Sequence, residues 1–116
     1  LYNSQDLARQ ALLLHCTATH IDQSIDQNLR MTQAYMNQDL DELLAITEEK
    51  VNNACDSTPE EMDALIYRRN ADWARQLPAI MKQSPTLVVV GAGHLPGQRG
   101  LLKLLQEQGY TVEPMN

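Results

Sequence analysis

The feature that most constrains the fold is a short apolar run that ends in glycines and a histidine. Residues 87–90 read Leu-Val-Val-Val, and Gly91, Ala92, Gly93 and His94 follow directly. β-Branched residues favour strands, and a run without polar alternation is typical of a strand covered on both faces. Open α/β sheets bind their ligands at the carboxyl ends of strands. The pattern therefore predicts that His94 lies at the functional edge of a sheet.

A helix and a second strand are expected after this corner. The leucine-rich residues 98–108 predict a helix, and Gly109 is expected to end it in the left-handed conformation. Residues 110–113 predict a short strand, and a crossover of this length makes the two strands parallel and right-handed. We therefore expect an α-rich α/β fold in a single domain. Residues 1–83 are helical in it, and residues 84–116 form a β-α-β unit.

Helical periodicity and capping signals run through the first two-thirds of the chain. Thr58 before Pro59, with Glu61 following, is the strongest helix start, and Asp39 is expected to cap an earlier helix. Pro78 is expected to kink or end the helix that carries it. Apolar residues at helical spacing predict a buried stripe near the start of the chain: Leu7, Ala11, Leu14, Ile21, Ile25, Leu29 and Met36.

Two parallel strands do not form a stable sheet alone, so further strands are needed. We expect the chain to be the carboxyl-terminal part of a larger α/β domain. The missing strands would come from the amino-terminal half of that domain or from a second copy of the chain. The chain begins with leucine rather than methionine, which agrees with the expectation of further residues upstream.

Charge and cysteine content limit the possible partners. The net charge is −6 and the nine basic residues are scattered, which argues against nucleic acid as a partner. No apolar run approaches the ~20 residues that span a bilayer. Cys16 and Cys55 fit no metal-binding spacing and could form one disulfide in an exported protein or remain thiols in the cytosol. We favour the disulfide, and with it a periplasmic or secreted location.

Three residues are candidates for chemistry. A neutral imidazole at His94 can bind a metal or move a proton, and Gly91 and Gly93 allow a sharp turn. The alternative is a histidine that only hydrogen-bonds its own loop. On the preceding helix, Arg69 falls inside an apolar arc and Asn70 at its edge, where a charged group needs a partner. A structural ion pair, or a guanidinium that reaches the surface, is the alternative there.

The glycine pattern also permits a dinucleotide site. Gly91-x-Gly93 lies between an expected strand and helix, and Glu113 stands about 20 residues on, where a ribose-binding acid belongs. Against this, Pro96 occupies the third glycine position, and few residues follow Glu113 to hold the rest of such a ligand.

The sequence resembles the TraB/GumN family, which includes the Tiki proteases. The likeness rests on Arg69-Asn70-x-x-Trp73, on Gly91-Ala92-Gly93-His94-Leu95-Pro96-Gly97, on Gly100-Leu101-Leu102 and on Gly109-Tyr110. It implies an α/β fold with two Gly-x-x-His motifs and a glutamate. Only the second motif is present here, at Gly91 to His94. The resemblance implies that His94 is a metal ligand or catalytic histidine, and that Arg69 and Asn70 belong to the same site.

The expected function is that of a metal-dependent hydrolase acting on peptides. His94 would bind a divalent metal ion, Arg69 and Asn70 would orient carboxylates or stabilise negative charge, and the loop with Gly91, Gly93 and Gly97 would support them. One histidine does not hold a catalytic ion, which needs about three protein ligands. The alternatives are a non-catalytic binding or regulatory domain that uses the same pocket, and a helical assembly module.

Overall fold

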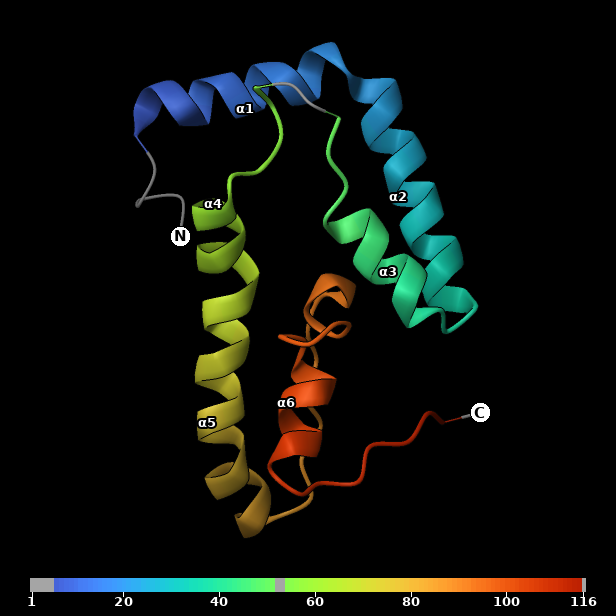
Figure 1. Cartoon of the computed structure of the whole chain (residues 1–116), viewed down its shortest axis with the longest axis vertical. Helices are drawn as coiled ribbons and strands as arrows, with labels where there is room; N and C mark the ends of the chain where they lie inside the picture. The colour runs from blue at the N-terminus through green and yellow to red at the C-terminus, as the bar shows by residue number, and fades with distance from the viewer. Residues whose placement is uncertain (1–5, 52–53, 116) are drawn as a thin grey trace.

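The computed structural model describes residues 6–51 and 54–115, and within these ranges the chain is built from helices. Figure 1 shows an upper part made by the first three helices and a lower part in which α6 lies beside the long α5. The elements in chain order are α1 (Leu7–Thr19), α2 (Ile21–Met36), α3 (Leu40–Thr47), α4 (Pro59–Met62), the π-helical turn η2 (Asp63–Tyr67), α5 (Arg68–Gln83), the 3₁₀ turn η3 (Ala92–His94) and α6 (Leu101–Glu107).

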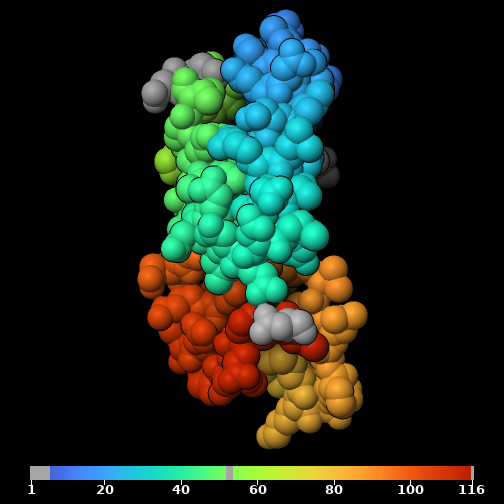
Figure 2. Space-filling view, turned by 90° about the vertical axis from the view of Figure 1, so that its right-hand side faces the viewer, coloured from blue at the N-terminus to red at the C-terminus, as the bar shows by residue number. Residues whose placement is uncertain are grey.

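The α2–α3 pair forms the first of two small cores. Asp39 caps α3 by accepting from the backbone N–H of Glu42, as the sequence predicts. Ala34, Leu43 and Ile46 are buried together. In Figure 2 this pair occupies the upper part of one face and the carboxyl-terminal residues the lower part.

The second core joins α5 to α6 and to the end of the extended segment before η3. Ala74, Leu77 and Leu101 form its buried centre, and Trp73 and Val90 pack against it. The helix that supplies most of this core begins as expected, because the Thr58 side chain accepts from the N–H of Glu61 and the Glu61 carboxylate accepts from the N–H of Thr58.

Pro78 does not end its helix, as α5 continues to Gln83. A proline inside a helix leaves the carbonyl four residues earlier without its usual donor. Here that carbonyl belongs to Ala74, and the side-chain amide of Gln108 donates to it at 2.8 Å. Gln108 follows α6, so the tertiary contact between the two helices supplies the hydrogen bond that proline removes.

The predicted β-α-β unit is wrong. Within residues 6–51 and 54–115 no strand forms, and residues 85–90 and 110–115 run as extended or irregular chain. Leu87 is 88% exposed and Val89 82% exposed, whereas Val90 packs on the α5–α6 core. The expected cover on both faces is thus absent, and a strand also requires a neighbouring strand to bond its backbone. No such neighbour occurs in the described ranges, and only a helix, α6, remains of the expected unit.

The amino-terminal apolar stripe is helical, as expected, but it is not buried. Leu7, Leu14 and Leu29 are 81%, 73% and 66% exposed, and Ile21 and Ile25 are about half exposed. An apolar face of this extent is unusual for a folded surface and is typical of a face that packs on another element. The first two helices therefore carry apolar side chains that the described residues leave uncovered.

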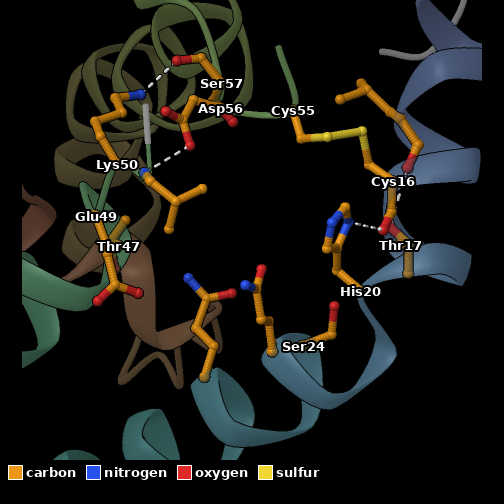
Figure 3. A pocket seen from close by; sticks show the side chains of 14 residues that line it. Cys16, Thr17, His20, Ser24, Thr47, Glu49, Lys50, Cys55, Asp56 and Ser57 are labelled. Carbon is orange, nitrogen blue, oxygen red and sulfur yellow. Dashed lines mark hydrogen bonds between the residues drawn. A yellow bond between two sulfur atoms is a disulfide. The ribbon is translucent and has the colours of Figure 1, made fainter. Parts of the chain in front are cut away.

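A disulfide and an arginine hold α1 to the rest of the molecule. Figure 3 shows the Cys16–Cys55 disulfide, which we favoured from the sequence, at the wall of a cavity of about 270 Å³. It joins cysteines 39 residues apart, and closing a loop of that length removes about 4 kcal/mol of unfolded-state entropy in the chain-entropy model. Near the other end of α1, Arg9 Nη2 lies 2.6 Å from Glu61 Oε1, and Arg9 Nη1 donates to the Ala54 carbonyl.

None of the helices in the described ranges has the length and apolar character needed to cross a bilayer, as expected.

We predict that the Arg9–Glu61 pair makes stability depend on acid pH. The Arg9 side chain holds the pKa of Glu61 at about 2, below its ordinary 4.5. A lowered carboxyl pKa stabilises the fold above the ordinary value, and this contribution is lost as the pH falls toward 2. Glu61→Gln is expected to reduce the unfolding free energy by about 1.5–3 kcal/mol at pH 7, measured by urea denaturation. The difference in unfolding free energy between Glu61→Gln and wild type should shrink towards pH 2.

Glu60→Gln, at an exposed neighbour, is the control. An equal loss of unfolding free energy in both variants at pH 7 would contradict the role of the Arg9–Glu61 pair.

Candidate functional site

The candidate site lies where the first turns of α5 meet the loop of residues 91–100. Asn70 on α5 is fully buried, at 0% exposed, and His94 at the end of η3 is 8% exposed. These are the buried polar residues of the described part of the chain. The structure thus brings together two residues that the sequence analysis selected, 24 positions apart.

The Asn70 side chain makes three hydrogen bonds to this loop. Its Nδ2 donates to the main-chain oxygens of His94 at 3.2 Å and of Arg99 at 2.9 Å. Its Oδ1 lies 2.8 Å from His94 Nδ1. Both N–H groups and the oxygen of this buried amide have hydrogen-bond partners, so its burial leaves no polar atom unsatisfied. Asn70 therefore fixes both ends of the loop, as well as the histidine ring.

The π-helical turn η2 explains why Asn70 rather than Arg69 faces inward. The apolar arc expected from the sequence assumed 100° per residue from Met62 onward and placed Arg69 within it. One extra residue in the turn rotates everything after it by roughly 100°. The buried face of α5 is consequently formed by Asn70, Ala74 and Leu77, and Arg69 is exposed. The expectation of an arginine inside the apolar face was wrong for this reason.

Arg69 still belongs to the neighbourhood of His94 through an aromatic ring. The Arg69 guanidinium lies 4.8 Å from the centre of the Trp73 ring, and the Trp73 and His94 ring centres are also 4.8 Å apart. Burial lowers the pKa of His94, and the charge of Arg69 lowers this pKa further. A lowered pKa favours the neutral imidazole, which is the form that binds metals and accepts protons.

The loop is anchored from both sides. Arg99 pairs with Asp63 at 2.5 Å and lies over the Tyr67 ring at 4.5 Å, which ties the loop to η2. On the other side, a Cβ at Gly93 would lie 3.3 Å from Thr47 Oγ1. The loop is thereby held between α3 and η2.

The glycines of the loop act in different ways. Gly97 adopts φ +88°, where a side chain would be strained, and a Cβ there would press on Leu44. Gly91 has φ −64°, so the turn at the histidine does not depend on a left-handed glycine there. Gly100 is the most restricted, because a Cβ would overlap the main-chain oxygens of Leu95 and Pro96. The sequence analysis did not select Gly100, Trp73 or Arg99 as site residues, although all three stand within or beside the stretches that carry the family resemblance.

The described residues do not complete a metal site. They contain no cluster of three or more His, Cys, Asp or Glu side chains able to hold an ion, so His94 would be one ligand among others from elsewhere. The remaining histidines bond to their own helix, since Thr19 Oγ1 lies 3.3 Å from His15 Nε2 and the Cys16 carbonyl 3.2 Å from His20 Nδ1. Figure 3 places His20 at the wall of the disulfide cavity.

A larger apolar groove lies on another side of the same loop. Its volume is about 720 Å³, and it runs between the α2–α3 corner, the loop, α6 and the carboxyl-terminal residues. His94 does not line it. Tyr35, Met36, Leu43, Leu95, Pro96 and Met115 are among the residues that do.

The chain belongs to the TraB/PrgY/gumN family, whose model matches residues 1–114. The resemblance seen in the sequence is thus confirmed. The metalloprotease TIKI2 of Danio rerio is 38% identical over 52 residues, which are 42% of this chain and 10% of that protein. The matched part is therefore about a tenth of that relative's length. No solved structure is significantly similar to the chain.

We predict that Gly100→Ala disrupts the site by displacing the loop. The added methyl group has no room against two main-chain oxygens, and overpacking of this kind costs about 1–3 kcal/mol or more. Thermal denaturation should show a clear loss of stability. Gly91→Ala is the matched control, since its Cβ would meet His94 Cδ2 at an ordinary 3.6 Å, and it should change stability by less than about 0.5 kcal/mol. Equal melting temperatures for the two variants would show that the 95–100 turn is not close-packed.

Proposed function

We propose that this chain supplies part of the active site of a metal-dependent hydrolase that acts on peptides, with His94 as its metal ligand. The observation that carries the proposal is the buried imidazole of His94, whose Nδ1 is bonded to Asn70. Its Nε2 has no partner among the described residues. Membership of the TraB/PrgY/gumN family and the similarity to a metalloprotease support hydrolysis of a peptide bond.

The chain's own residues would have distinct tasks in such a site. His94 Nε2 presents a lone pair, and a metal bound there would lower the pKa of a coordinated water. Arg69, exposed beside Trp73, is placed to attract a carboxylate or to stabilise developing negative charge. Trp73 lies between these two groups, with its ring centre 4.8 Å from the Arg69 guanidinium and 4.8 Å from the His94 ring centre.

We infer that a segment outside the described residues completes the site. One imidazole does not hold a catalytic ion, and the extended residues 87–90 carry backbone groups without hydrogen-bond partners in the described ranges. Such a segment, packed on them, would bury Leu87 and Val89 and would carry the remaining ligands. The amino-terminal half of the same domain or a second copy of the chain could supply it.

The decisive experiment for function compares metal content and peptide hydrolysis in the natural full-length protein and its His94→Ala variant. The variant should lose its bound metal and hydrolyse a fluorogenic peptide library roughly 100-fold or more slowly, the scale on which loss of a catalytic group acts. His15→Ala, on exposed α1, is the control and should match wild type. Equal metal content in wild type and His94→Ala would refute the ligand role. Bound metal without hydrolysis of any peptide would favour the binding-domain alternative.

A further inference from the structure

The orientation of the buried amide determines which nitrogen of His94 carries hydrogen. Two of the three groups around Asn70 are main-chain oxygens, at 3.2 Å for His94 and 2.9 Å for Arg99. A carbonyl oxygen only accepts hydrogen bonds, so the amide nitrogen must face both of them. With the amide turned around, its oxygen would face two oxygens at these distances. The Oδ1 atom is therefore the one that faces the imidazole.

This orientation leaves a single arrangement for a neutral ring. Asn70 Oδ1 is an acceptor, and His94 Nδ1 lies 2.8 Å from it, so Nδ1 must donate. In a neutral imidazole one nitrogen carries hydrogen and the other carries the lone pair. We propose that Asn70 is a positioning residue that holds His94 as the Nδ1–H tautomer. The lone pair on Nε2 is thereby kept free to bind a metal ion. This inference rests on the proposed function of His94 and assigns Asn70 its part in it.

Burial separates this role from a catalytic one. Asn70 is 0% exposed and its amide is engaged by three groups of the protein, so it does not touch a substrate or a metal ion. It acts through His94, as the carboxylates and carbonyls that bond the second nitrogen of metal-binding histidines do in other proteins. The sequence analysis expected Asn70 to orient carboxylates or stabilise charge. The geometry instead assigns it the role of orienting the His94 ring.

The ring is also held against rotation. Trp73 packs on it at 4.8 Å between centroids and 45° between planes, and the His94 main-chain oxygen is bonded to the same amide as its side chain. A ring flip would remove the Nδ1 bond and place carbon against Oδ1. The Asn70 amide therefore fixes the tautomer and the direction of Nε2 together.

The test is the ring nitrogen spectrum of the ¹⁵N-labelled natural protein, freed of metal with a chelator at neutral pH. His94 should show a protonated Nδ1 and an unprotonated Nε2, with the exposed ring of His15 as internal reference. In Asn70→Ala the His94 signals should move toward a mixture of tautomers. Asn28→Ala, at an exposed asparagine on α2, should leave them unchanged.

The wild-type spectrum alone can overturn the proposal, whether or not Asn70→Ala folds. A proton on Nε2 in wild type, or an unchanged His94 pattern in a folded Asn70→Ala, would show that Asn70 does not set the tautomer. Because the spectrum is recorded without metal, its outcome is independent of the metal and hydrolysis assays. The Nδ1–H tautomer together with an absence of metal binding would refute the proposed function and leave the role of Asn70 intact.

Discussion

The Asn70 amide is the interaction on which the lower part of the molecule depends. It joins the first turns of α5 to both ends of a six-residue stretch, at His94 and at Arg99, and the whole side chain is buried. A buried amide is costly when any of its hydrogen bonds is missing. The loop therefore adopts the one arrangement that satisfies the amide, and the position of the imidazole follows from that constraint.

Two local irregularities in the long helix make this arrangement possible. The π-helical turn η2 rotates α5 so that Asn70 faces the loop. Pro78 has no N–H to donate to the Ala74 carbonyl, and the Gln108 side chain donates to it instead. Each departs from regular helix geometry, and each is compensated by a contact with residues 95–108. Arg99 binds Asp63 at the start of η2, and Gln108 binds near Pro78. The packing of the carboxyl-terminal residues on α5 is thus specified at both irregular points.

The sequence predicts local signals well and tertiary context poorly. The caps at Asp39 and Thr58 and the left-handed Gly109 are present as predicted. The contact of Asn70 with His94 is tertiary, and only the family resemblance indicated that the two residues share a site. Capping depends on neighbouring residues alone, which is why it can be predicted from sequence. The π-helical turn cannot be, because no residue between Asp63 and Tyr67 prevents an ordinary helix. Arg69 was consequently assigned to the wrong face.

The failed β-α-β prediction has a different cause from the misplaced arginine. Residues 87–90 keep the alternation of a strand, with Val90 on the α5–α6 core and Leu87 and Val89 in solvent. Their backbone has the extended form, but a sheet is a property of two segments and not of one. The same reasoning applies to α1 and α2, whose apolar stripe is helical as expected and yet exposed. In both places the pattern predicts a buried surface, and the described residues leave that surface exposed. Periodicity shows which side chains share a face, whereas burial of that face depends on a neighbouring element, which a local pattern does not specify.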